Sequence, residues 1–159
     1  MKIILFRFQK EKVYFTECFI DSGKLAVNSK EKEEISLNEE YIPGEKYKRL
    51  LNELSQIVEK HSPNLIMYQS PGLYMGSLKD REGFASATML HLFCYQNDIE
   101  LFELTPTVVR NNLAIKLKDF KGLREQAKVQ VLKDYKILKS DKLFEGLVLL
   151  FLLRGTFES

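Results

Sequence analysis

The chain has 159 residues, of which 45% are hydrophobic and 29% charged, and its formal net charge at pH 7 is +2. This composition excludes a disordered chain and is sufficient for one globular domain, which we expect to span residues 1–159. The longest apolar stretch, LVLLFLLRG, meets Arg154 after seven residues and is too short to cross a bilayer. Cys18 and Cys94 fit no metal-binding or redox spacing, so we expect two buried thiols and a cytoplasmic protein.

The first forty residues have the composition of β-strands. KIILFRF, residues 2–8, and KVYFTECFI, residues 12–20, are rich in β-branched and aromatic residues, and a polar link of hairpin length joins them. The turn-forming residues 21–24 separate them from a third expected strand in KLAVNS. The charged span over residues 30–40 predicts a loop or a ragged strand edge.

Helices and strands alternate after this region. Apolar residues at helical spacing predict a helix over residues 47–58, and Pro63 precedes a short strand at residues 65–68. A second helix runs through TMLHLFCYQ, a strand follows in IELFELTP, and two further helices are predicted over residues 125–136 and 141–153. This order predicts an α/β fold with a mixed five-stranded sheet, in which an antiparallel β-meander precedes parallel strands and helices cover both faces. It is the order of the ribonuclease H-like fold.

Three stretches carry a resemblance to a known family. They are YKRLLNELSQIVEKHSPNLIMY, then GFASATMLHLFCYQNDIELFELTPTVVRNNL, then LREQAKVQVLKDYKIL. Together with the final apolar helix, they resemble the RuvC group of Holliday-junction endonucleases in order and spacing, over about two thirds of the chain. The resemblance implies a metal-dependent nuclease with four carboxylates: one on the first strand, one at the end of the fourth, and two on the last helix.

The matching positions of this chain lack most of those carboxylates. They hold Phe6 or Arg7, then Gln69, then Lys142 and Glu145. Two divalent ions need bridging anionic oxygens, and here a single carboxylate remains to supply them. A shift of one residue brings in Asp141, four residues before Glu145 and on the same face of the expected helix.

The resemblance therefore implies a degenerate active site with no bound metal or cofactor, in which Glu145, Asp141 and Gln69 are only weak catalytic candidates. Asp141 follows Ser140 at an expected helix start, where a capping role also explains it. An arginine at the first position, Arg7, would repel a metal ion. We expect no nuclease activity. The alternative is an active Mg- or Mn-dependent endonuclease with a rearranged site.

A rearranged site needs a third acid beside Asp141 and Glu145. The two further candidates are Asp21, at a turn, and Glu103, on the last expected strand.

The C-terminal part of the chain is basic. Residues 104–159 carry 11 basic and 6 acidic side chains, whereas residues 1–103 carry 13 and 16. In the resembled family the matching loop and helix start contact the nucleic-acid backbone, and an aromatic side chain among cations can stack on a base. The residues expected to bind DNA or RNA are Lys116, Lys118, Phe120, Lys121, Arg124 and Lys128. A solvated lysine-rich helix face explains the same pattern without any ligand.

A homodimer is also expected, because the helix bearing Met89, Leu92, Phe93 and Tyr95 resembles the family's dimer-forming helix. The leading hypothesis is a catalytically degenerate RuvC-like protein that binds nucleic acid or supports an assembly, with no membrane partner. The two alternatives are the active endonuclease and a protein-interaction subunit that binds no nucleic acid.

Overall fold

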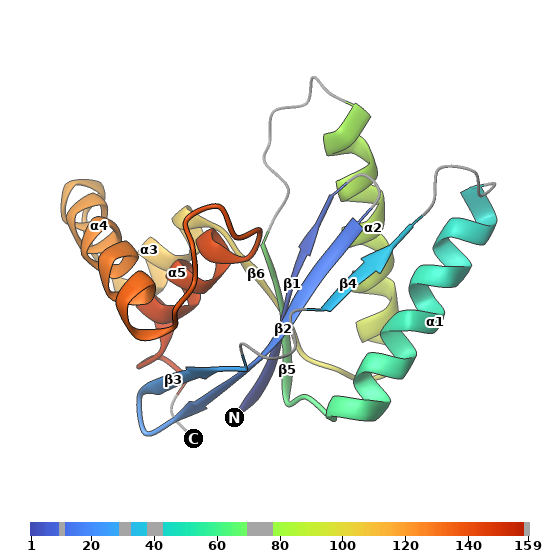
Figure 1. Cartoon of the computed structure of the whole chain (residues 1–159), viewed down its shortest axis with the longest axis horizontal. Helices are drawn as coiled ribbons and strands as arrows, with labels where there is room; N and C mark the ends of the chain where they lie inside the picture. Colours follow the sequence, from blue (N-terminus) through green and yellow to red (C-terminus); the bar gives the residue numbers. More distant parts are fainter. Residues whose placement is uncertain (10–11, 29–32, 38–42, 70–77, 158–159) are drawn as a thin grey trace.

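The protein is built on one mixed β-sheet, shown by a computed structural model that describes residues 1–9, 12–28, 33–37, 43–69 and 78–157 (Figure 1). The strands are β1 (Lys2–Phe8), β2 (Lys12–Asp21), β3 (Lys24–Val27), β4 (Glu33–Ser36), β5 (Leu65–Gln69) and β6 (Leu101–Leu104). Their order is β3-β2-β1-β5-β6, with β4 also paired to β2. The β1–β2 pair is antiparallel, and the β1–β5 and β5–β6 pairs are parallel. The predicted mixed sheet is confirmed.

The sheet holds six strands where five were predicted, because a short strand lies in the span over residues 30–40. β3 pairs with residues 18–21 of β2, and β4 pairs with residues 12–15 of the same strand. The two short strands therefore follow one another along a single edge, and the sheet is five strands wide. The expected link at residues 10–11 and the polar segment 70–77 lie outside the described residues.

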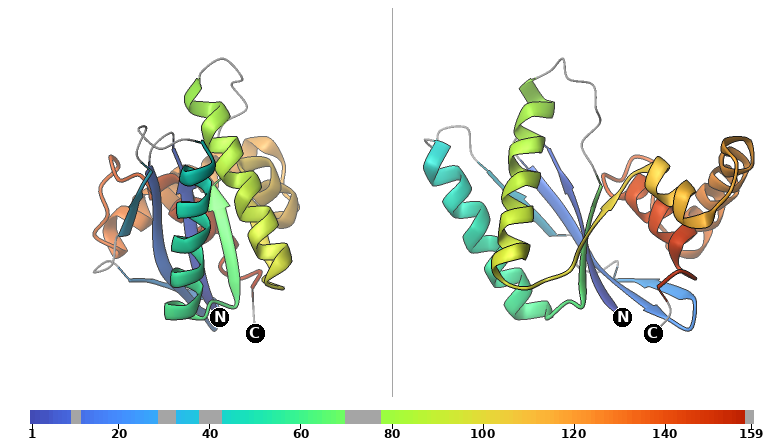
Figure 2. Two further views of the ribbon diagram at one scale, coloured as in Figure 1. Left: turned by 90° about the vertical axis from the view of Figure 1, so that its right-hand side faces the viewer. Right: turned by 180° about the vertical axis from the view of Figure 1, so that it is seen from behind.

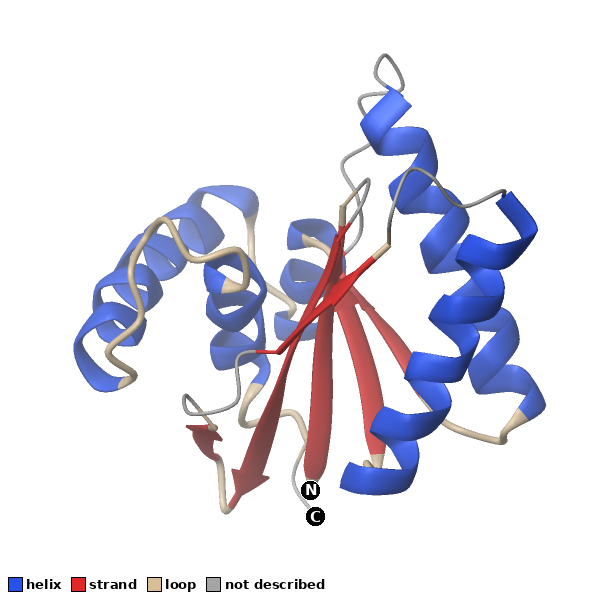
Figure 3. Cartoon of the chain, turned by 45° about the vertical axis from the view of Figure 1, so that its right-hand side comes forward, coloured by secondary structure: helices blue, strands red, loops and turns tan. Residues whose placement is uncertain are grey.

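Helices cover both faces of the sheet, as predicted (Figures 2 and 3). They are α1 (Pro43–His61), α2 (Leu78–Gln96), α3 (Pro106–Leu113), α4 (Leu117–Asp134) and α5 (Phe144–Leu153). α1 and α2 pack on one face, and α3, α4 and α5 pack on the other. None of the helices in the described part of the chain is long and apolar enough to cross a membrane.

Several helix boundaries differ from the prediction: α1 and α2 are longer than expected, and α3 lies where no helix was predicted. α4 begins eight residues before the expected position 125, because Phe120 is buried in the core on the same helical stripe as Ala127 and Val131. This burial outweighs the low helix propensity of Gly122. α5 begins at Phe144, three residues later than expected, because a turn that includes Asp141 precedes it.

Alternation along the strands decides which residues face which helices. Ile3 and Leu5 of β1 lie in the core beneath α3, α4 and α5, whereas Ile4, Phe6 and Phe8 lie in the core beneath α1 and α2. Successive side chains of a strand point to opposite faces, so Arg7 is placed on the same face as Leu5.

The same alternation holds on β5. Leu65 and Met67 face α5, and Gln69 continues that face to the end of the strand.

The two cysteines are free and buried, as predicted. Cys18 lies on β2 beneath α4 and α5, and Cys94 lies on α2 beneath the opposite face. Burial disfavours the thiolate and raises the pKa of Cys94 to about 11.

Candidate functional site

The positions expected to form a catalytic site meet at the carboxyl ends of β1 and β5, against the start of α5. Arg7 and Gln69 are register partners in the parallel β1–β5 pair. Both side chains are half-buried and lie on the face that α5 covers. The sequence left open whether Phe6 or Arg7 occupies the first matched acidic position on β1. The structure places Arg7 there, because Phe6 faces the opposite side of the sheet and is fully buried.

Arg7 ties the sheet to the segment that leads into α5. One terminal nitrogen of its guanidinium donates a 2.6 Å hydrogen bond to the carbonyl oxygen of Lys142, 135 residues away in sequence. Lys142 itself is exposed, so its backbone rather than its ammonium group reaches the site. A cationic hydrogen-bond donor thus stands where the resembled nucleases carry a metal-binding acid.

Gln69 lies beneath the first turn of α5. A Cβ atom added to Gly146 would lie 3.5 Å from the Gln69 Oε1 atom and 3.3 Å from a methyl carbon of Leu5. The missing side chain at Gly146 therefore lets α5 approach β1 and β5 closely. Oε1 is buried and has no hydrogen-bond partner among the residues that the structure describes.

Glu145 points toward α4. Its Oε2 atom accepts a 2.8 Å hydrogen bond from Arg124, and the two side chains are 36% and 29% exposed. Arg124 follows Phe120 by four residues on the inward stripe of α4, which explains why a guanidinium reaches α5 at this point. The carboxylate that sequence matching places in the site is thus neutralised by an arginine.

Asp141 is not on the helical face that it was expected to share with Glu145. It lies in the turn before α5, where its carboxylate accepts a 3.0 Å hydrogen bond from the backbone N–H of Leu143. Its carbonyl oxygen accepts a second bond from the N–H of Phe144. The prediction of one shared face is wrong. The expected capping role is also not found, because the N-cap of α5 is Leu143 and the Asp141 carboxylate bonds within the turn that precedes the helix.

The two remaining acids do not join the site. Glu103 is the β6 register partner of Tyr68, on the face toward α1 and α2. Burial and the neighbouring Glu103 carboxylate raise the pKa of Tyr68 above its ordinary value. Asp21 is exposed at the end of β2, where Ser22 donates a hydrogen bond to it. Within the described ranges, no three His, Cys, Asp or Glu side chains are grouped so that they could hold a metal ion.

The six residues expected to bind nucleic acid fall into three groups. Lys116, Lys118 and Lys121 are exposed at the start of α4. Arg124 and Lys128 are only partly exposed, and each forms an ion pair. Phe120 is 3% exposed and packs in the core, so the prediction that it stacks on a base is wrong. Its position on the inward stripe of α4 is the sequence signal that could have revealed this.

Lys121, Arg124 and Lys128 lie along one stripe of α4, at spacings of three and four residues. Lys128 donates a 2.9 Å hydrogen bond to Glu125. This bond and the charge of Lys128 hold the pKa of the Glu125 carboxyl below its ordinary value.

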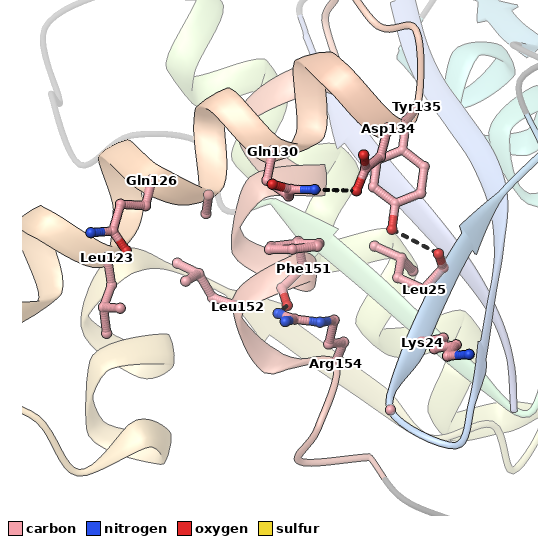
Figure 4. Close-up of a pocket in the computed structure, with 12 residues that line it drawn as sticks. Lys24, Leu25, Leu123, Gln126, Gln130, Asp134, Tyr135, Phe151, Leu152 and Arg154 are labelled. Carbon is pink, nitrogen blue, oxygen red and sulfur yellow. Dashed lines mark hydrogen bonds between the residues drawn. The ribbon is translucent and has the colours of Figure 1, made fainter.

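A groove of about 660 Å³ lies elsewhere, between α4, α5 and the β2–β3 turn (Figure 4). Arg154 stacks on the ring of Phe151 at 3.9 Å and donates to that residue's carbonyl oxygen. Tyr135 donates to the carbonyl oxygen of Leu25. The Tyr135 ring also packs edge-to-face on Phe151 at 6.4 Å. Tyr135 thus joins the end of α4 to β3 and α5, on the side of α4 away from Lys121.

The fold resembles solved structures, although no family model and no curated protein matches the sequence. Thermus thermophilus RuvC in complex with a Holliday junction substrate superposes with a TM-score of 0.68 at 11% identity, over 99% of this chain and 94% of that one. The yeast mitochondrial Holliday junction resolvase gives 0.53 at 13% identity, over 96% and 78%. The Fowlpox virus resolvase bound to Holliday junction DNA gives 0.51 at 12% identity, over 98% and 92%. The chain therefore has the RuvC-like, ribonuclease H-like fold of the Holliday junction resolvases.

Proposed function

We propose that this chain is a RuvC-like protein that binds nucleic acid, alone or within an assembly, and has lost the metal-dependent nuclease site of the proteins it resembles. The observation that carries the proposal is the Arg7 guanidinium, which occupies the first acidic position and donates to the Lys142 carbonyl oxygen. The resemblance implies metal-binding carboxylates at that edge. Here a hydrogen bond links the same strand to the start of the last helix.

Electrostatics argues against a pair of divalent ions in this cleft. Two such ions require several anionic oxygens within coordination distance. The positions that match the family offer Arg7, the neutral amide of Gln69, the backbone of Lys142 and one carboxylate already paired with Arg124. A guanidinium beside a divalent ion adds repulsion where attraction is needed.

Nucleic-acid binding can survive the loss of the metal site, because phosphate contacts require only cations at suitable positions. Thermus thermophilus RuvC and the Fowlpox virus resolvase were solved with Holliday junctions. In this chain the exposed Lys118 and Lys121, with the partly exposed Lys128, supply a basic side of α4. We propose this side of α4 as the main contact with a DNA or RNA backbone.

The test is a gel-shift series with four-way DNA, duplex DNA, single-stranded DNA and RNA, in EDTA and in Mg²⁺ or Mn²⁺. The expected result is binding that needs no metal, weakens as salt rises and leaves every substrate uncut. Reversing the charges of Lys118 and Lys121 to glutamate should abolish binding. Reversing Lys48 and Lys60, which are exposed on α1 across the sheet, is the matched control and should preserve it.

Two outcomes would replace this proposal. Cleavage of four-way DNA that disappears in Glu145→Ala would establish the active endonuclease. A protein that binds none of the four nucleic acids, yet co-purifies with another protein, would favour the interaction subunit.

We further propose a two-fold dimer through α2. Leu90 and Phe93 are buried against the sheet, whereas Leu92 and Tyr95 are 46% and 85% exposed on the outer side of that helix. Two exposed side chains three residues apart suit a pairing of helices, and Leu92→Glu should convert the dimer to a monomer in sedimentation.

The two free, buried thiols agree with function in the reducing cytoplasm.

A further inference from the structure

Arg124 uses only part of its capacity to donate hydrogen bonds. One terminal nitrogen donates to Glu145, while the Nε atom is buried and has no partner in the part of the chain that the structure describes. A guanidinium carries five N–H donors in a planar fork that matches the oxygens of carboxylates and phosphates. The Glu145 carboxylate therefore neutralises Arg124 without satisfying it.

A second guanidinium reaches the same short segment from the sheet. Arg7 contacts the backbone of Lys142, and Arg124 contacts Glu145 three residues further along. Arg7 arrives from β1 and Arg124 from α4, so the start of α5 lies between two arginines. The dipole of α5 adds positive potential at its first turn, although the N–H groups of Leu143 and Phe144 already donate to Asp141.

The surrounding charges also favour an anion. Lys121 and Lys128 lie on the stripe of α4 that contains Arg124, one turn to either side of it. Glu145 is the anionic group that touches Arg124, and Glu125 is engaged by Lys128. An entering anion would therefore meet several cations and the Glu145 carboxylate, which occupies the place it needs. The Asp141 carboxylate lies nearby in the turn before α5, where it accepts from the N–H of Leu143.

We infer that the surface where Arg7 of β1 and Arg124 of α4 meet the start of α5 binds a backbone phosphate group of a nucleic acid through these two arginines, and that Glu145 competes with this phosphate for Arg124. The inference rests on the proposed function and names the group that this region binds. Glu145 then acts as an internal substitute for phosphate in the free protein. Binding requires the carboxylate to release the guanidinium.

A Glu145 that competes with phosphate and a Glu145 that binds a metal ion predict opposite effects of neutralising its carboxylate. If Glu145 held a catalytic cation, its neutralisation would weaken the site. If it competes with phosphate, neutralisation removes one repulsive charge and frees a donor group. A half-exposed ion pair is worth little to stability, so the fold should tolerate the change.

The decisive measurement is the affinity of fluorescein-labelled four-way DNA, by anisotropy in EDTA, for the wild type and Glu145→Gln. The variant should bind roughly five- to tenfold more tightly, because a weak ion pair and a close repulsion are both removed. Glu59→Gln changes the net charge equally but lies exposed on α1, beyond the opposite face of the sheet. This control should change the affinity by less than about twofold.

A double-mutant cycle assigns the gain to Arg124. In an Arg124→Gln background, which binds more weakly, adding Glu145→Gln should bring no further tightening, since there is no guanidinium to release. Arg7→Gln should also weaken binding. Thermal melting of every variant, followed by circular dichroism, establishes that the proteins compared are folded.

The possible failures are distinct. A wild type that binds none of the tested nucleic acids overturns the proposed function and this inference together. A wild type that binds, with Glu145→Gln equal to Glu59→Gln or weaker than wild type, overturns the inference alone. A gain that persists in the Arg124→Gln background also overturns it, because the effect would then be one of general charge.

Discussion

The two faces of the sheet end differently at the carboxyl ends of β1 and β5. Toward α1 and α2 the strands end in Phe8 and Tyr68, whose rings pack edge-to-face at 6.3 Å. Toward α5 the same strands end in Arg7 and Gln69. One face thus continues the apolar core to the edge of the sheet, and the other ends in polar groups.

The same two strands therefore carry a packing site at one face and the proposed binding region at the other. The aromatic end is a packing site, where close contact between buried rings stabilises the fold. The polar end holds a charged hydrogen bond and a buried amide oxygen without a partner among the described residues, and the proposed function rests on these two features. Mutations at the two ends should therefore act on different measurements.

The largest effect is expected on the aromatic face. Phe6 is fully buried, with ring centroids 6.0 Å from Phe8 and 5.6 Å from Phe15. Phe6→Ala should lower the free energy of unfolding by about 3–5 kcal/mol in urea denaturation, because it leaves a cavity in the core. Nucleic-acid affinity per folded molecule should not change. A loss below about 1 kcal/mol would show that this face is not the packed core that its burial indicates.

An intermediate effect is expected where α5 approaches the polar face. Gly146→Val places methyl groups against the buried Leu5 and Gln69, and should lower the free energy of unfolding by about 1–3 kcal/mol. Gly122→Ala is the control, since a Cβ atom there meets nothing within 4 Å. It should stabilise α4 by up to about 1 kcal/mol. Equal effects at both glycines would contradict a close approach at Gly146.

The smallest effect is expected for Arg7 itself. Arg7→Met keeps the apolar stem of the side chain and removes the bond to the Lys142 carbonyl oxygen. The free energy of unfolding should fall by about 1 kcal/mol, because a half-exposed charged hydrogen bond contributes little net stability. Lys121→Met, at an exposed position on α4, is the control and should leave the free energy of unfolding nearly unchanged. A loss as large as that of Phe6→Ala would make Arg7 part of the core scaffold.

Much of the fold follows from local patterns. Their content of β-branched and aromatic residues predicted β1 and β2, and the apolar stripe of residues 47–58 predicted most of α1. The sequence left the region of β4 open between a loop and a strand edge, because Glu33–Ser36 is short and charged. Its pairing with β2 rather than its composition makes it a strand.

The candidate site was predictable in part. Sequence matching brought Gln69 and Glu145 to one region, and both do lie at the start of α5 or directly beneath it. It misjudged Phe120, because a lysine-rich segment suggested an exposed helix while its inward stripe remained apolar. It also placed Asp141 on a helix that begins three residues later.

The sequence by itself determined the order of most of the elements and the scarcity of carboxylates at the matched positions. Those properties depend on spacing between near neighbours and on residue identity. The partners of Arg7 and Glu145 were decided only by the tertiary structure. A hydrogen bond across 135 residues, or between two helices, depends on how distant segments pack, and no local pattern encodes that distance.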